Sequence, residues 1–480
     1  MFWKTLNDFT LTENGALTRS TSKSALVDMF AMGGSMRTRQ DSEIINMFSN
    51  AFKENPQLAM KCLFYIRDCR GGLGEKRFFR VATRWLLNKY KDAPKAELIK
   101  LMSYYGSWKD VFEVMTHDEY AEFVSAVFKR DIREKTPTLL EKYMPSVGGS
   151  SNKEAEAIAR YMEITPRQYR KALSALRAKL NLVETKMCAK DWDEINYEHV
   201  PSKAMLNYNK AFGRNDTDKF GYYINKVKSG EAKINASVLY PYEIYTRLME
   251  GKINDREATA LWDNLPDFTN GKNAIVMADV SGSMAGLPIA VSISLALYFA
   301  ERNKGRFNGS FMTFSGNPSV EQVRGKTLEE KMRNISRANW DMNTDLIKAF
   351  KTILSICLAE KVPQEEMPET IYIISDMEFD EATGSGSRFG RKSDFPVTNY
   401  EAIKEKYALA GYTIPKIVFW NVNSRQNNVP VSKDEINTVL VSGSSPSVFK
   451  FAVSEGCSPE TFMLEVINGE RYSPVERLFM

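Results

Sequence analysis

The chain has 480 residues, 43% hydrophobic and 26% charged, with a formal net charge of +5. This length exceeds one ordinary core, and the balance of apolar and charged residues is typical of a folded protein, so we expect roughly two to four domains. There are two histidines, and the five cysteines form no Cys-x-x-Cys pair. This excludes most serine-hydrolase, cysteine-protease and zinc-hydrolase sites, which leaves the chemistry of carboxylates and hydroxyls.

No segment predicts export or membrane insertion. Residues 1–15 lack a basic stretch followed by an apolar core, so they do not resemble a secretory signal. The longest apolar run, 289–300, is interrupted by Ser292 and Ser294 and is too short to span a bilayer. We therefore expect a cytoplasmic protein, a monomer with no membrane partner.

Residues 1–265 read as helical. Apolar residues recur at three-to-four spacing in 58–65, 78–87, 98–102 and 112–128. Breaks fall at Gly71-Gly72 and in the Gly/Ser-rich stretch 145–152. Thr165 can cap a helix whose first turn holds Pro166. The pattern predicts an all-helical array of short antiparallel pairs, similar to HEAT repeats.

Two helix faces in this part are basic. Arg77, Arg80 and Arg84 recur at i, i+3 and i+7, and the helix after Pro166 repeats that spacing. Such faces could bind the phosphates of RNA, or they could be solvated, or paired with nearby acids such as Asp68. The candidate RNA-binding residues are Arg67, Arg70, Lys76, Arg77, Arg80, Arg84, Arg167, Arg170 and Arg177.

The pattern changes near residue 266. The run AIVMADV is continuous and apolar and ends in a Gly/Ser turn, as a buried parallel strand does. Further strands are expected at 309–314, 370–374, 416–420 and 438–441, with helical segments between them. Residues 272–480 should therefore form a doubly wound, mostly parallel, Rossmann-like α/β domain.

Oxygen-bearing side chains gather at the strand ends of this domain. Asp279, Ser281 and Ser283 directly follow the first strand, Thr344 opens a later helix, and Asp376 follows the strand IYIIS. Hydroxyls and carboxylates suit a hard divalent ion, Mg²⁺ first, with Ca²⁺ or Mn²⁺ as alternatives. The simpler interpretation is an Asp and a Ser that only cap a helix.

A Gly/Ser-rich segment, 382–394, leaves the same edge of the sheet and carries Arg388, Arg391 and Lys392. A basic loop beside a bound cation would favour an anionic ligand, so these three residues are candidate ligand contacts. An ordinary surface insertion explains the segment equally well.

The string MADVSGSM and its surroundings resemble the von Willebrand A family over about the last 210 residues. By that resemblance Asp279, Ser281 and Ser283 hold the ion of a metal-ion-dependent adhesion site. Thr344 joins them in some states, and Asp376 supports the ion, often through water.

The whole chain resembles the Ro autoantigen (TROVE) family, and more closely a poorly characterised group related to it. The resemblance is carried by FYIRDCRGGLGEKRFF, by LSALRAKLNLVETKMCAKDWDEINYEHVPSKAM and by MADVSGSM. It implies a helical ring closed by the von Willebrand A domain and binding of small noncoding or misfolded RNA. The helical part here is shorter than in Ro proteins, which leaves ring closure open.

Three functions follow, in order of preference. The first is a non-enzymatic RNA-binding protein, a ribonucleoprotein scaffold whose metal-bearing domain helps to recruit RNA or a protein partner. The second is a metal-dependent protein-interaction scaffold without RNA, in which the ion captures a partner's carboxylate. The third is an enzyme that cleaves phosphoesters with Asp279, Asp376, Glu378 and Asp380; no general base is evident for it.

Overall fold

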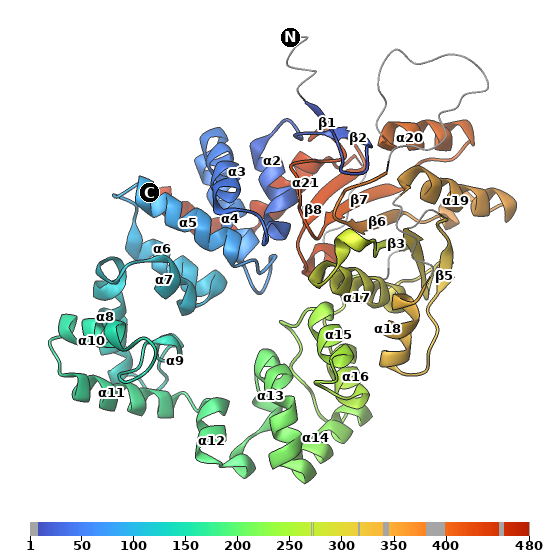
Figure 1. Ribbon diagram of the computed structural model, residues 1–480. Coiled ribbons are helices and arrows are strands. Elements are labelled where there is room, and N and C mark those ends of the chain that lie inside the picture. The colour runs from blue at the N-terminus through green and yellow to red at the C-terminus, as the bar shows by residue number, and fades with distance from the viewer. Residues whose placement is uncertain are drawn as a thin grey trace.

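The structure is a computed structural model that describes residues 8–269, 271, 273–314, 317–338, 345–380, 399–450 and 456–479. A helical array is followed by an α/β unit, as the sequence predicts (Figure 1). The helices of the array are α2 (Ala25–Met32), α3 (Asp41–Glu54), α4 (Pro56–Arg67), α5 (Arg77–Lys89), α6 (Lys95–Leu101), α7 (Trp108–Val114), α8 (His117–Arg133), α9 (Leu140–Tyr143), α10 (Asn152–Tyr161), α11 (Pro166–Lys179), α12 (Val183–Ala189), α13 (Ser202–Asn215), α14 (Thr217–Ser229), α15 (Pro241–Met249) and α16 (Asp255–Asp263).

Local sequence sets where these helices begin. The Thr165 side chain accepts a hydrogen bond from the Gln168 amide, and Pro166 occupies the first turn of α11, which confirms the predicted start. Asn55 caps α4 in the same way, again with a proline, Pro56, in the first turn. Apart from α12, these helices bury apolar side chains against their neighbours.

The prediction of an all-helical first part was wrong at its beginning. β1 (Phe9–Leu11) and β2 (Leu17–Arg19) form an antiparallel hairpin. The hairpin packs on the α/β unit: Gly15 bridges to Asp380, and Arg19 bridges to Val429. Strands of three residues leave too short an alternation to be recognised in the sequence.

The α/β unit is built on a six-stranded sheet in the order β5-β4-β3-β6-β7-β8. All neighbouring strands are parallel except β4 and β5, which confirms the mostly parallel sheet. The elements are β3 (Ala274–Asp279), α17 (Leu287–Arg302), β4 (Ser310–Phe314), β5 (Val320–Gln322), α18 (Leu328–Ser336), α19 (Leu346–Ala359), β6 (Thr370–Ser375), α20 (Asn399–Leu409), β7 (Lys416–Asn421), β8 (Thr438–Ser442) and α21 (Pro459–Ile467).

The helical array leaves the α/β unit on one side and returns to it on another (Figure 1). At one end α2 packs against β8, and at the other end α15 packs against α17. The last segment, η8 (Glu470–Phe479), packs against α4 and α6. There Asp68 accepts hydrogen bonds from Arg471 Nη2 at 2.7 Å and from the Tyr472 hydroxyl at 3.1 Å. The chain is thus tied to itself at both ends of the array.

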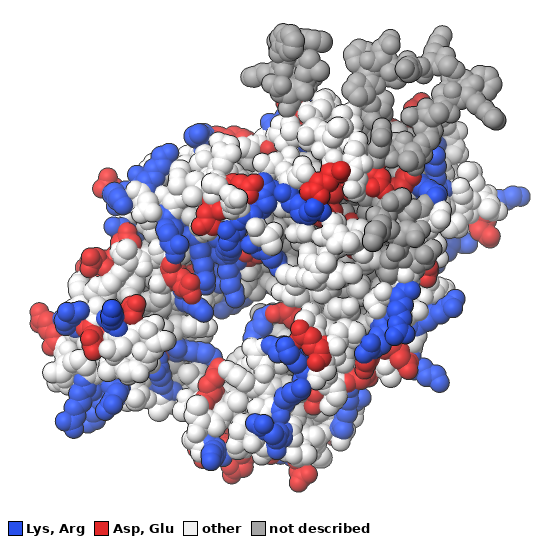
Figure 2. All heavy atoms as spheres, in the orientation of Figure 1, with Lys and Arg blue, Asp and Glu red and all other residues white. Residues whose placement is uncertain are grey.

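The middle of the array is continuous as well. Glu184 of α12 lies 2.9 Å from Lys142 Nζ of α9 and accepts a hydrogen bond of 3.3 Å from the Tyr208 hydroxyl of α13. Together with the contacts at the two ends, this closes the protein into a ring. Figure 2 shows the resulting opening near the middle of the molecule.

Candidate functional site

The first candidate site lies at the carboxyl edge of the sheet. Asp279 ends β3, and Asp376 follows β6, which pairs with β3. The chain adds β4 and β5 on one side of β3 and then β6, β7 and β8 on the other, so the order of the strands switches between β3 and β6. Ligands of open α/β sheets bind at such a switch point. The topology therefore brings the two predicted carboxylates to the expected edge.

Short contacts hold the side chains at this edge. Asp279 is fully buried; its Oδ1 accepts a hydrogen bond from the Ser281 amide at 2.9 Å, and its Oδ2 accepts one from Ser375 Oγ at 2.6 Å. The hydroxyl oxygens of Ser281 and Ser283 lie 3.1 Å apart. Ser375 stands next to Asp376 but was not predicted, because nothing in the sequence distinguishes it from other strand-end serines.

Asp376 provides the test of whether these residues fit a cation. Its side chain is 1% exposed, and its Oδ2 is buried without a hydrogen-bond partner among the described residues. The nearest compensating charge is Arg425, whose Nη1 lies 3.6 Å from that oxygen. A buried carboxylate oxygen with one long ion pair, beside two hydroxyls, is a donor set that a hard divalent ion would satisfy.

The electrostatics also favour a cation. Burial, together with the charge of Asp376, raises the pKa of Asp279 to about 6. A cation at this edge would stabilise the ionised carboxylate. Within the described residues no group of three or more His, Cys, Asp or Glu side chains could hold a metal. An ion here would therefore depend on the serine hydroxyls as well as on the two carboxylates.

Part of the predicted site cannot be placed. Thr344 lies outside the described residues, and so do Arg388, Arg391 and Lys392 of the basic segment. Asp345, next to Thr344, caps α19 by accepting a hydrogen bond from the Lys348 amide at 2.9 Å.

The other two acids of the enzymatic alternative face the hairpin. Glu378 is buried and accepts hydrogen bonds from the Glu13 amide at 2.7 Å and from Asn428 Nδ2 at 3.0 Å. Asp380 pairs through its backbone with Gly15. These contacts give Glu378 a role in anchoring the hairpin.

A groove of about 340 Å³ adjoins this carboxyl edge of the sheet, which we call the metal edge after the predicted ion. Ser283 lines it together with two arginines, Arg37 and Arg425. Neither arginine was predicted. The two loops that carry Arg37 and Arg425 meet in the fold but lie almost 400 residues apart in the sequence. An arginine pair beside a candidate cation site favours an anionic ligand.

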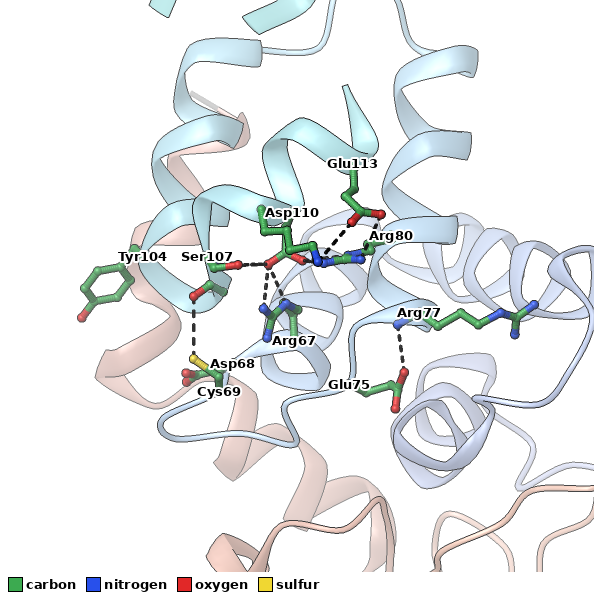
Figure 3. A network of polar contacts seen from close by, with 12 residues as sticks. Arg67, Asp68, Cys69, Glu75, Arg77, Arg80, Tyr104, Ser107, Asp110 and Glu113 are labelled. Carbon is green, nitrogen blue, oxygen red and sulfur yellow. Dashed lines mark hydrogen bonds and ion pairs between the residues drawn. The ribbon is translucent and has the colours of Figure 1, made fainter. Parts of the chain in front are cut away.

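The predicted arginines around the helix turn have unequal surroundings (Figure 3). Arg67 is 2% exposed, and its Nε and Nη2 donate to Asp110 Oδ2 at 2.9 and 2.7 Å. Arg80 Nε donates to the other oxygen of Asp110 at 2.8 Å. Asp110 thus joins the end of α4 and the helix α5 to α7. Asp68, the acid named from the sequence, pairs with Arg471 instead.

Arg77 and Arg84, on the same face of α5 as Arg80, also have partners within the protein. Arg77 pairs with Asp41 at 2.5 Å and donates to the Arg37 carbonyl at 3.3 Å. Arg84 contacts the Glu113 carbonyl. By contrast, Lys76 is exposed and has no ion pair of 4 Å or less among the described residues.

The second predicted basic face divides in the same way. Arg177 donates to the carbonyls of Glu141 and Met144 at 2.9 and 2.7 Å, so it closes the end of α9. Arg167 and Arg170 are exposed on α11. One arginine of this face is thus held by backbone carbonyls, and the other two are exposed.

The second candidate site lies inside the ring. A cavity of about 580 Å³ is lined from several sides of the array, with Tyr143 from α9, Lys203 from α13 and Tyr240 from the start of α15. Its basic lining residues are Arg37, Arg67, Arg70, Lys76 and Lys203, and its acidic ones are Glu75 and Glu243. Arg67 Nη1 is buried without a hydrogen-bond partner among the described residues. Three of the predicted residues, Arg67, Arg70 and Lys76, thus meet at this cavity.

Comparison with known proteins gives families without an assigned activity. Residues 12–122 and 115–274 match the family described as domain of unknown function DUF2828, and residues 273–471 match the domain of unknown function DUF7788. The uncharacterized protein L728 of Acanthamoeba polyphaga mimivirus is 28% identical over 519 residues, which cover 98% of this chain and 89% of that protein.

Among solved structures, that of the Ro (RSR) protein of Deinococcus radiodurans covers 93% of this chain and 100% of its own, with 12% identity and a TM-score of 0.38. In the described part of the chain, no helix is long and apolar enough to cross a membrane. Because the matches to the first family together span 12–274, more than half of the 480 residues, the chain belongs to the DUF2828 family.

Proposed function

We propose that the protein binds RNA at the opening of its ring, as a non-enzymatic ribonucleoprotein scaffold of the Ro type. The observation that carries this proposal is the basic cavity inside the ring. Five cationic side chains line it against two carboxylates, and tyrosines line it beside them. Cationic groups bind the backbone of single-stranded RNA, while aromatic rings stack with its bases.

The charge balance of the cavity supports an anionic ligand. Glu75 pairs with Arg37 at 3.4 Å, and Glu243 pairs with Lys203. These pairs leave Arg70 and Lys76 as exposed cations at the turn after α4, near the buried Arg67 Nη1. Figure 2 shows Lys and Arg side chains gathered on this side of the opening.

A filter-binding experiment with single-stranded and structured RNA tests the proposal. From about 50 to about 200 mM salt the affinity should fall by at least about tenfold, because phosphate contacts release counterions. The double variant Arg70→Ala/Lys76→Ala should bind more weakly and show a salt slope lower by about two.

The matched control is Arg167→Ala/Arg170→Ala, which removes the same charge from α11, away from the cavity lining. It should leave affinity within about twofold of the unsubstituted protein. Failure of the protein to bind any RNA at low salt would contradict the proposal.

The proposal includes a divalent ion, Mg²⁺ first, at Asp279, Ser281 and Ser283, with Asp376 in support, in a domain of the von Willebrand A type. The strand-end position of these side chains and the unpartnered Asp376 Oδ2 support it. When bound, the ion would supply an electrophilic position for a ligand oxygen.

The second candidate function is a metal-dependent protein-interaction scaffold. It is favoured by the groove beside Ser283, where Arg37 and Arg425 could hold an acidic side chain of a partner. Partner affinity would then require a divalent ion and one acidic partner residue, and competition by RNA would have no effect.

A further inference from the structure

Arg37 belongs to both candidate sites. It lines the cavity inside the ring and also the groove beside Ser283 at the metal edge. Among the described residues that line these two spaces, Arg37 alone is shared. The cavity inside the ring and the groove beside Ser283 are thus neighbours that meet at Arg37.

The position of Arg37 is fixed by the loop that carries it. This loop joins α2 to α3, and it meets the loop after β7 where the Ser424 amide donates to the Ser35 carbonyl at 3.2 Å. Arg39 Nη2 adds a hydrogen bond of 3.0 Å to Asn427 Oδ1. The loop of Arg37 is therefore attached to the loop that carries Arg425.

Arg37 retains hydrogen-bonding capacity. Its Nη2 donates to Ser444 Oγ at 3.1 Å and lies 3.4 Å from Glu75, which faces the ring cavity. Its Nε is buried and has no hydrogen-bond partner within the described residues. A buried donor of this kind is costly unless a ligand or water satisfies it.

Arg425 links the groove to the metal edge. Its Nη1 lies 3.6 Å from Asp376 Oδ2, and its Nη2 pairs with Glu13 at the tip of the hairpin. With Asp376 neutralised by a divalent ion, this guanidinium would lose part of its attraction to the edge. It would then be available to an anion in the groove, and the charge of the ion would attract the same anion.

We infer that Arg37 and Arg425 couple the two sites, so that a divalent ion at the metal edge and an anionic strand in the ring opening bind cooperatively. The inference rests on the proposed function and adds a regulatory relation: the ion tightens RNA binding through arginines that do not bind the ion. Because such coupling is reciprocal, RNA must tighten the binding of the ion by the same factor.

Calorimetric titration of Mg²⁺ into the full chain, with and without a saturating oligo(U) of about ten nucleotides, measures the coupling directly. The expected result is an increase in Mg²⁺ affinity of about fivefold or more when RNA is present, and the same factor in the reverse titration. In Arg37→Gln both ligands should still bind, and the two Mg²⁺ affinities should agree within about twofold.

Two further variants serve as controls for the loss of charge at Arg37 and for the loss of the ion. Arg37→Lys keeps the charge and should retain part of the coupling, which separates loss of charge from damage to the loop. Asp279→Asn should abolish Mg²⁺ binding and leave RNA affinity at the value seen without Mg²⁺. Circular dichroism melting of each variant shows whether it is folded.

The outcomes separate the inference from the proposed function. RNA and Mg²⁺ that bind the unsubstituted protein independently would overturn the inference and leave RNA binding intact. Coupling that survives unchanged in Arg37→Gln would overturn the role of this residue. Absence of RNA binding would overturn both proposals, and absence of Mg²⁺ binding would overturn the coupling and the ion site together.

Discussion

Glu141, at the start of α9, shows how one buried residue can make the fold depend on pH. It is fully buried, and neither of its carboxylate oxygens has a hydrogen-bond partner among the described residues. Burial, with a contribution from Asp131, raises the pKa of Glu141 from 4.5 to about 7. The folded protein therefore holds a proton here over a range of pH in which the unfolded chain has lost it.

The sign of the pH dependence follows from linkage. Between the two pKa values the folded state binds more protons, so stability is fullest below about pH 4.5 and is lost as the pH rises through about 7. The loss amounts to at most roughly 3 kcal/mol. Glu141→Gln removes the titration and stays neutral at every pH, so the variant should be the more stable protein at about pH 8.

Urea unfolding at about pH 5 and about pH 8 checks this prediction. The matched control is Glu122→Gln, at an exposed position of α8, which should have the same effect at both pH values. Equal effects of Glu141→Gln at the two pH values would show that Glu141 is ionised in the folded protein.

At the residue scale the sequence predicted which side chains meet at the carboxyl edge of the sheet better than it predicted the partners of the basic faces. Asp279, Ser281 and Ser283 lie within five residues and share one strand end, so a local pattern was enough. The roles of Arg67 and Arg80 depend on Asp110, which lies 43 and 30 residues away. Charge spacing along a helix cannot show which cation meets a distant acid, so the sequence left open whether these arginines bind RNA, are solvated or are paired.

At the scale of elements, the two helices that flank the turn after α4, α4 and α5, are attached to α7 by the buried carboxylate of Asp110. Arg67 and Arg80 each donate to it, and the Ser107 amide donates to it at 3.0 Å (Figure 3). Gly106 lies against this group, since a Cβ at that position would fall 2.3 Å from Asp110 Oδ2. The position of the cavity-lining turn thus depends on one ion cluster.

Asp110→Asn should destabilise the protein by about 3 to 5 kcal/mol, because it leaves the buried guanidinium of Arg67 without its counter-charge. Guanidinium chloride unfolding measures the change. Arg84→Ala, which removes an exposed cation from the same face of α5, is the control and should cost less than about 0.5 kcal/mol. A small effect of Asp110→Asn would mean that water reaches Arg67.

Element types were predictable where the apolar pattern was long. The helical character of the array, with the helices around 58–65, 78–87 and after Pro166, and the strands β3, β4, β6, β7 and β8 were expected from the apolar pattern. The β1–β2 hairpin and the edge strand β5 were not, since each of these strands has only three residues. The missed hairpin matters for the site, because its tip residue Glu13 pairs with Arg425.

At the scale of the whole molecule, ring closure was left open by the sequence and depends on contacts between distant segments. The weakest part of the circumference is α12, which has no buried residue. Its residue Glu184 connects it to α9 through Lys142 and to α13 through Tyr208. Neighbouring α11 and α13 both bury apolar side chains. Local opening of the ring should therefore begin at α12.

Hydrogen exchange with mass spectrometry should show faster amide exchange in 183–191 than in α11 or α13. Glu184→Ala should increase that exchange by about fivefold at most, since a half-exposed ion pair contributes no more than about 1 kcal/mol. Glu198→Ala, at an exposed position outside these contacts, should change nothing. If α12 were protected as strongly as α13, the ring would open elsewhere or only by global unfolding.

An anionic strand that spans the opening should slow exchange in α12, because its contacts to Arg70 and Lys203 would hold opposite walls of the cavity together.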